Sequence, residues 1–126
     1  MFGRYVEGIG IRPTFDRLFG SMRKNGKGQP IDAIMKQVLC FFADGTSRHL
    51  VQFDRLKEDA GYAGAIESVP EELVSSHAVK RFFGAFSWLR IWMFRRLLQE
   101  LFLWRLRITQ PSVIELGIDT MVMDND

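Results

Sequence analysis

Apolar and polar residues alternate through residues 111–126, and this pattern limits what the chain can fold into. The alternation predicts one β-strand that opens at Pro111 and ends in an acidic turn. One face of the strand carries Glu115 and Asp119 on either side of Gly117. The other face is apolar and consists of Ile114, Leu116, Ile118 and Val122. A single strand cannot pair its own backbone groups, so we expect partner strands that this sequence lacks and interpret the chain as the front part of a larger protein.

The overall composition is that of an ordinary globular protein. The 126 residues are 47% hydrophobic and 25% charged, which is enough chain for about one domain with a core. The net charge is only +2, but basic residues concentrate between 77 and 107. The acidic residues after them are Glu115, Asp119, Asp124 and Asp126. This polarity suits a polyanion at the basic part and metal ions at the acidic part, or simply two solvated surfaces.

Three features of the sequence bear on where the protein resides. The single cysteine, Cys40, excludes an internal disulfide and fits a reducing compartment. No basic start followed by an apolar run and a cleavage site is present, so we expect no secretory signal. The most apolar window, residues 82–104, contains Arg90, Arg95 and Arg96, whose charges are costly in a bilayer. We therefore expect a cytoplasmic protein without a membrane partner.

Helical periodicity dominates the sequence before residue 108. We expect residues 1–12 to be largely irregular and helices to follow at about 14–22, 30–42, 47–58, 75–86 and 88–106. Thr14 is a good N-cap, Pro30 suits a first helical turn, and Gly61 ends the third helix. The last helix is apolar nearly all round, which is typical of a helix enclosed by more partners than this chain offers. The fold class is therefore mainly α.

The fourth predicted helix has two chemically different sides. His77, Lys80 and Arg81 lie on one side, and Val79, Phe82, Phe83 and Phe86 form the inward side. A helix that begins at a serine cap and carries two cations outward can track DNA phosphates or enter a major groove. The same pattern is also typical of an amphipathic core helix with a charged solvent face.

Asp119 lies in the middle of the predicted strand, beside Gly117 on the same face. Asp is a poor strand former, so its position favours a functional role. The alternative is a charge on an edge strand that blocks aggregation. The residues alone leave both interpretations open.

The order and spacing of four segments resemble the N-terminal part of bacterial insertion-sequence transposases with a DDE catalytic domain, of the group-one type. The segments are residues 41–45, 53–59, 76–83 and 114–120, and the resemblance covers about residues 15–126. It implies a helical, DNA-binding region at 1–107 and, at 108–126, the first strand of an incomplete RNase H-like α/β domain. It places the first catalytic aspartate at Asp119. Because the family's acidic pattern before that aspartate differs here, Asp124 is the alternative.

The resemblance also implies a chemistry for the intact enzyme. It would bind the DNA ends of the insertion sequence, possess a homo-oligomeric form, and cut and rejoin DNA with two Mg²⁺ or Mn²⁺ ions. Two hard cations need several oxygen ligands, so one aspartate cannot hold them. We therefore expect this chain to bind DNA weakly and to catalyse nothing. The alternatives are a small non-enzymatic helical DNA-binding or interaction module and a protein that lies on a membrane surface through its last helix.

Overall fold

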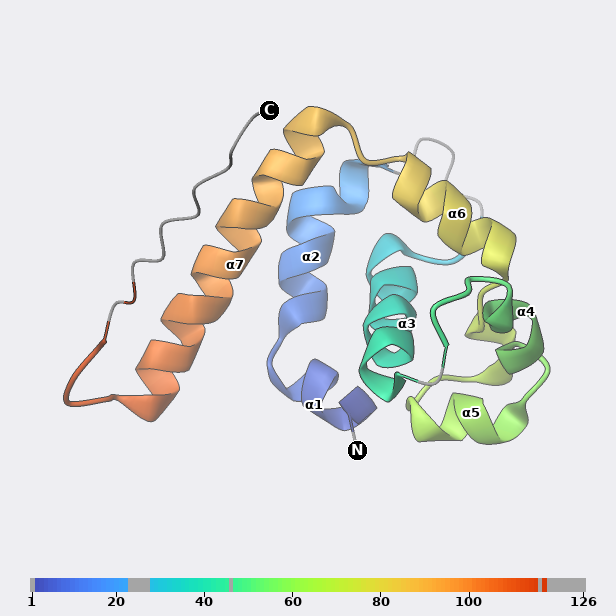
Figure 1. The fold of residues 1–126 in the computed structure, drawn as a ribbon, viewed down its shortest axis with the longest axis horizontal. Helices are drawn as coiled ribbons and strands as arrows, with labels where there is room; N and C mark the ends of the chain where they lie inside the picture. The colour runs from blue at the N-terminus through green and yellow to red at the C-terminus, as the bar shows by residue number, and fades with distance from the viewer. Residues whose placement is uncertain (1, 23–27, 46, 116, 118–126) are drawn as a thin grey trace, which may run out of the picture.

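The structure is a computed structural model that describes residues 2–22, 28–45, 47–115 and 117. These residues form a mainly helical fold that contains no β-strand in the part described (Figure 1). The elements are α1 (Phe2–Gly8), α2 (Ile11–Phe19), η1 (Gly20–Met22), α3 (Ile31–Asp44), α4 (Gln52–Leu56), α5 (Ala60–Ala65), η2 (Pro70–Glu72), α6 (Ser76–Gly84) and α7 (Trp88–Thr109). In Figure 1, α2 lies between α7 and α3, and α4, α5 and α6 group on the other side of α3. The prediction of a mainly α fold is confirmed.

The N-terminal region is helical, so the prediction of an irregular segment at residues 1–12 is wrong. Gly10 joins α1 to α2 with a positive φ of 65°, a conformation in which glycine is not strained. Ile11 and Phe15 of α2 are buried, and this tertiary burial offsets the weak local pattern. Thr14 consequently lies inside α2 rather than at its N-cap.

The main hydrophobic core is built around α2. Phe15 and Phe19 are fully buried, with ring centroids 4.6 Å apart. The ring of Phe94 in α7 lies 4.7 Å from Phe19, and the ring of Phe82 in α6 lies 6.2 Å from Phe15. Burial of such rings is the main favourable contribution to folding. This aromatic cluster therefore joins α2, α6 and α7.

Helix α3 (Ile31–Asp44) lies where a helix is predicted at about 30–42, but Pro30 is its N-cap rather than part of its first turn, and Gly45 is its C-cap. Gly45 has a φ of 69°, the left-handed conformation that commonly ends a helix. Helical periodicity predicts an apolar face of Ile31, Ile34, Met35, Val38, Leu39 and Phe42. Four of these six are buried, but Leu39 is half-buried and Phe42 is 53% exposed. Lys36 and Gln37 are buried as well, which periodicity did not predict.

The two buried polar residues of α3 hold the chain around it in place. Lys36 Nζ donates to the Glu7 carboxylate at 2.7 Å and to the Glu67 carbonyl at 3.0 Å. Gln37 Nε2 donates to the Glu72 carbonyl at 2.8 Å, and the backbone N–H of Val74 donates to the Gln37 side-chain oxygen at 3.0 Å. Buried polar groups of this kind are stable because each has a hydrogen-bond partner. They tie α1 and the segment before α6 to α3.

The helix predicted at residues 47–58 is shorter than expected, because α4 spans only Gln52–Leu56, and α5 follows at Ala60–Ala65, where no helix was predicted. The Ser47 hydroxyl accepts a hydrogen bond from the backbone of His49 at 3.1 Å, which favours a turn over a helix start. Asp59 caps α5 by accepting from the backbone of Gly61 at 2.8 Å and of Tyr62 at 3.1 Å. Gly61 therefore lies inside α5 and does not end a helix.

Helix α7 runs three residues beyond its predicted end and then stops. Gln110 adopts a left-handed conformation, with φ 40° and ψ 54°, and its N–H donates to the Leu106 carbonyl. Residues 111–115 and 117 are neither helix nor strand, so the segment after Pro111 does not continue α7 within the residues described. Asp119, Asp124 and most of the predicted strand lie outside the described residues, so the RNase H-like strand and the division at residue 107 stay predictions.

Candidate nucleic-acid interface

Helix α6 carries the predicted DNA-contacting residues, and its N-terminus is fixed from two directions. The Ser75 hydroxyl accepts a hydrogen bond from the backbone of Ala78 at 3.3 Å, as expected of an N-cap. The Asp54 carboxylate of α4 accepts from the Ser76 backbone at 2.9 Å and from the Ser76 hydroxyl at 2.7 Å. The start of α6 is therefore attached to α4.

The inward side of α6 holds the helix against the core. Val79 and Phe82 are buried, at 0% and 5% exposed, and Phe86, which follows the helix, packs against the core as well. Phe83 was also predicted to face inward, but it is 42% exposed. It lies at i+1 from Phe82, about 100° around the helix, so both rings cannot enter the same core.

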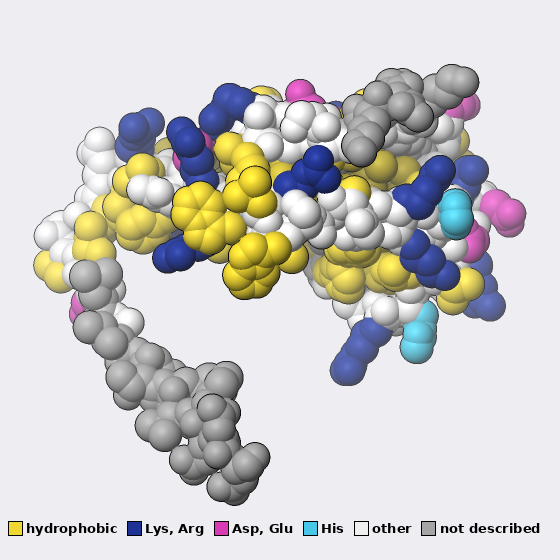
Figure 2. Space-filling view, turned by 90° about the horizontal axis from the view of Figure 1, so that it is seen from above, with side chains coloured by type: hydrophobic (Ala, Val, Ile, Leu, Met, Phe, Trp, Pro, Cys, Tyr) yellow, Lys and Arg dark blue, Asp and Glu magenta, His cyan; other side chains and the backbone are white. Residues whose placement is uncertain are grey.

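The opposite side of α6 is basic and accessible. His77, Lys80 and Arg81 are all exposed, as predicted. Among the residues that the structure describes, Lys80 and Arg81 form no salt bridge. In Figure 2, Lys, Arg and His side chains gather at the end of the molecule formed by α4, α5 and α6. The three residues thus form an exposed surface on which Lys80 and Arg81 carry positive charge and form no salt bridge within the described chain.

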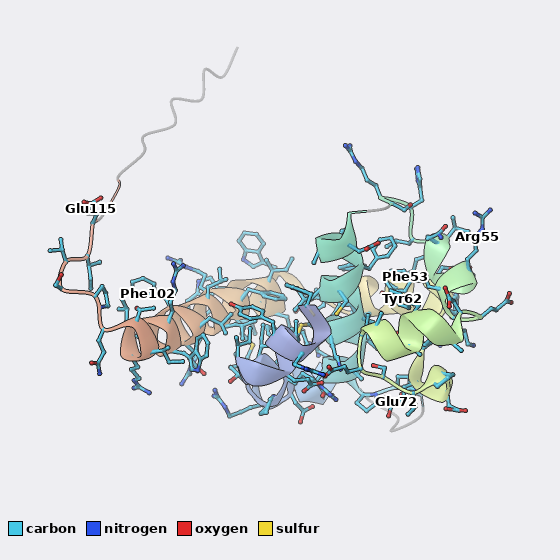
Figure 3. The ribbon with its side chains drawn as sticks, turned by 90° about the horizontal axis from the view of Figure 1, so that it is seen from below. Phe53, Arg55, Tyr62, Glu72, Phe102 and Glu115 are labelled. Carbon is cyan, nitrogen blue, oxygen red and sulfur yellow. The ribbon has the colours of Figure 1, made fainter. Side chains whose placement is uncertain are left out.

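Sequence reasoning missed that Lys57 belongs to the same surface. The pKa of the Asp54 carboxyl is lowered, first by the hydrogen bond from the Ser76 hydroxyl, then by the Ser76 N–H, and further by the positive charges of Lys80 and Lys57. Both lysines therefore lie close to one carboxylate at the junction of α4 and α6. Their proximity depends on how the helices pack, so no local pattern indicates it. Arg55 is also exposed and points outward from α4 (Figure 3).

The predicted metal ligands cannot be placed, because Asp119 and Asp124 lie outside the described residues. Within the part of the chain that the structure does describe, no three His, Cys, Asp or Glu residues gather as a metal site would require. Glu115, the described carboxylate nearest to them in sequence, is exposed. The assignment of Asp119 to a metal site stays a prediction.

A second surface feature is an apolar cleft of about 420 Å³ between α3, α6 and the start of α7. It is lined by Met35, Val38, Leu39, Phe82, Phe83, Phe86, Ile91 and Phe94. The exposed ring of Phe83 belongs to this cleft, which gives it apolar neighbours outside the main core. The sequence showed these residues as helix faces but did not indicate that the faces enclose a cleft.

Comparisons with protein-family models, with curated proteins and with solved structures find no match to this chain. None of the helices in the described residues has both the length and the apolar character needed to cross a membrane. What the chain does therefore has to be inferred from its own residues.

Proposed function

We propose that this chain is the DNA-binding front part of a bacterial insertion-sequence transposase with a DDE catalytic domain. The proposal is supported by the order of the segments at 41–45, 53–59, 76–83 and 114–120 and by the basic surface of α6. The exposure of Lys80 and Arg81, on a helix whose other side is anchored in the core, is the observation that carries it.

The chemistry of the α6 surface suits the phosphate backbone of DNA. Lys80 and Arg81 are successive residues on the exposed side of α6, and Lys57 lies near the same Asp54 carboxylate as Lys80. Exposed cations release the counterions of DNA when they bind its phosphates, so affinity falls steeply with salt. His77 lies one turn before Lys80 and Arg81 and supplies a hydrogen-bond donor. Contacts of this kind position DNA and distinguish sequences only weakly.

In this proposal Asp119 supplies the first metal ligand of the catalytic domain, with Asp124 as the alternative. Mg²⁺ or Mn²⁺, when bound, would activate water or a DNA 3′-hydroxyl and stabilise the leaving oxygen. A pair of such ions needs more carboxylates than these residues provide. The 126-residue chain by itself is therefore expected to bind DNA without cutting it.

The proposal is tested by removing the α6 cations. Lys80→Ala with Arg81→Ala should weaken binding to unrelated DNA duplexes about equally and lower the salt slope by roughly one unit for each phosphate that is no longer neutralised. The matched control is Arg105→Ala with Arg107→Ala, which removes the same charge from exposed positions near the end of α7, far from α6 (Figure 1). Affinity is measured by fluorescence anisotropy from low to high salt.

Two results would contradict the proposal. If both double variants reduce affinity and slope equally, binding reflects net charge rather than a site on α6. If the parent chain does not bind DNA even at low salt, the basic side of α6 is only a solvated surface.

A non-enzymatic interaction module is the second candidate function. The apolar cleft beside α7 favours it, because a contiguous exposed apolar surface is typical of a binding site. Extension of the chain by the coding sequence that follows Asp126 discriminates between the two candidates. Only the transposase proposal predicts that the extended chain cleaves DNA with a metal ion and that Asp119→Ala abolishes this cleavage.

A further inference from the structure

Helix α7 exposes two tryptophans near its start. Trp88 and Trp92 are 85% and 59% exposed, and Trp88 is the most exposed large hydrophobic residue in the part of the chain described. Trp88 precedes the buried Leu97 by nine residues, so at roughly 100° per residue the two lie on opposite sides of the helix. Neither tryptophan stacks on another aromatic ring of the described residues. Two large π surfaces are therefore accessible on the side of α7 opposite its buried residue.

Polar residues share this side of the helix. Arg95 and Gln99 are both exposed and lie within about 20° of Trp88 around the helix, and Trp92 lies within about 40° of it. We call Trp88, Trp92, Arg95 and Gln99 the outer face of α7. Arg95 forms no salt bridge with any residue that the structure describes. Exposed apolar residues flank the outer face, Leu89 and Leu103 on one side and Ile91, Leu98 and Phe102 on the other.

The surroundings of the outer face are basic. Between Leu73 and Gln99 the sequence contains no Asp or Glu, whereas it contains Lys80, Arg81, Arg90, Arg95 and Arg96. Arg96 lies 3.6 Å from Glu100, but its side chain is 69% exposed, and an ion pair as exposed as this contributes little. The guanidinium of Arg96 is therefore also accessible to an anion.

The outer face is held in a fixed position relative to α6. The Ser87 hydroxyl caps α7 by accepting a hydrogen bond from the backbone N–H of Arg90 at 3.4 Å, and the Arg90 guanidinium donates to the Ala85 carbonyl at 2.6 Å. The ring of Phe86, which follows α6, lies 5.3 Å from the ring of Phe94 in α7. Figure 2 shows hydrophobic side chains with Lys and Arg side chains beside them over α6 and α7. One ligand can therefore contact the basic surface of α6 and the outer face of α7 together.

We infer that the outer face of α7 is a stacking platform for the unpaired bases of single-stranded DNA. The inference rests on the proposed function, because it takes DNA as the partner. Every base has a π face that stacks on an aromatic side chain, and nearby arginines attract the phosphates between the bases. In a duplex the bases are already stacked and paired, so the tryptophans cannot reach their π faces. The outer face of α7 therefore distinguishes single strands from duplexes, which the cations of α6 do not.

The spacing of the two tryptophans suits this role. Trp88 and Trp92 lie one helical turn apart, about 6 Å along α7 at roughly 1.5 Å per residue. A base held between two rings needs about 7 Å, twice the roughly 3.4 Å that separates stacked bases. The pair can thus hold one base between its rings, with Arg95 one turn further along the same side.

Fluorescence anisotropy with labelled oligothymidylate and with a blunt duplex of the same length tests the inference. Trp88→Ala with Trp92→Ala should weaken binding of the single strand about tenfold or more, because each lost stack contributes substantially to affinity. Affinity for the duplex should change less than about twofold, since its phosphates are bound without stacking. Lys80→Ala with Arg81→Ala should weaken binding of both DNA forms.

Two further variants separate stacking from general apolar contact. Trp88→Phe with Trp92→Phe keeps the π surfaces and should restore most of the affinity for the single strand, whereas Trp88→Leu with Trp92→Leu keeps only the apolar surface and should not. The matched control is Leu98→Ala with Ile108→Ala, which removes two exposed apolar side chains of α7, 63% and 61% exposed, from outside the outer face. Circular dichroism checks that each variant keeps its helices.

Tryptophan fluorescence gives a direct readout of stacking. Oligothymidylate should quench the emission of the parent chain, and the duplex should not. Trp88→Ala with Trp92→Ala leaves the half-buried Trp104 as the only tryptophan. Loss of the quenching in this variant would assign it to the outer face.

Three results would overturn the inference and leave the proposed function standing. The first is unchanged affinity of the alanine variant for oligothymidylate, and the second is an equal loss for single strand and duplex. The third is full affinity of the leucine variant; flotation of this variant and the parent with phosphatidylglycerol vesicles would then assign the outer face to a lipid surface. If the parent chain binds neither DNA form at low salt, the proposed function and the inference both fail.

Discussion

Gln37 offers a sharp test of how the structure positions α6. Its side chain is 1% exposed and bridges the Glu72 carbonyl and the Val74 N–H, immediately before the Ser75 cap of α6. Gln37→Met keeps the length of the side chain but removes both hydrogen bonds. We expect the variant to lose stability because a buried donor is left without its acceptor.

The size of the loss in the free energy of unfolding depends on which of the two partners of Gln37 stays buried without a hydrogen bond. Val74 is 3% exposed, so its N–H cannot reach water once the glutamine oxygen is gone. A buried polar group without a partner costs about 1–3 kcal/mol. The hydrogen bond to the Glu72 carbonyl is only part-buried, so its loss costs less than the loss at Val74. The expected loss in the free energy of unfolding is therefore about 2 kcal/mol, and it arises mainly from Val74.

Gln29→Met is the matched control. Gln29 also donates to a carbonyl of the same segment, that of Glu71 at 2.9 Å, but this hydrogen bond is exposed. Its removal should change stability by less than about 0.5 kcal/mol. Urea unfolding followed by tryptophan fluorescence measures both variants, and the midpoint for Gln37→Met should fall by roughly 1 M. Equal losses for the two variants would refute the reasoning, because burial would then not decide the cost.

Three further predictions concern stability and pH. Phe15→Ala should cost about 3–5 kcal/mol in urea unfolding, because Phe15 is fully buried, whereas Phe42→Ala, at a side chain 53% exposed, should cost far less. The pKa of Glu7 is lowered, chiefly by its hydrogen bond from Lys36 and against a smaller effect of burial. Its contribution to stability is therefore present above the unfolded pKa near 4.5 and is lost as the pH falls through the folded pKa. Glu7→Gln should weaken the dependence of the free energy of unfolding on pH between pH 7 and 3. Burial raises the pKa of Tyr62 to about 12. Since the unfolded tyrosine ionises near 10, stability should fall above that pH, and Tyr62→Phe should remove this fall and cost little at pH 8, because the buried hydroxyl has no hydrogen-bond partner among the described residues.

Local sequence patterns determined the helices whose signals are strong along the chain. Pro30 and Gly45 mark the ends of α3, and the periodicity between them identifies most of its buried face. The sequence predicted Ser75 or Ser76 as the cap of α6, and Ser75 is the cap. The exposure of His77, Lys80 and Arg81 followed from the 3.6-residue period. These features depend on neighbouring residues only, so the sequence is sufficient to predict them.

The tertiary structure decided what depends on residues far apart in the sequence. Residues 2–8 form a helix although their local pattern is weak, because Val6 is buried and Gly3 approaches the backbone of Ile66 so closely that a Cβ would lie 2.8 Å from its carbonyl oxygen. Lys36 can be buried only because Glu7 and Glu67 meet it there. Lys57 joins the basic surface of α6 through the bonds of Asp54 to Ser76. Periodicity showed that α7 is apolar nearly all round, but packing against α2 decided which of its residues are buried, because only the partner helix distinguishes them.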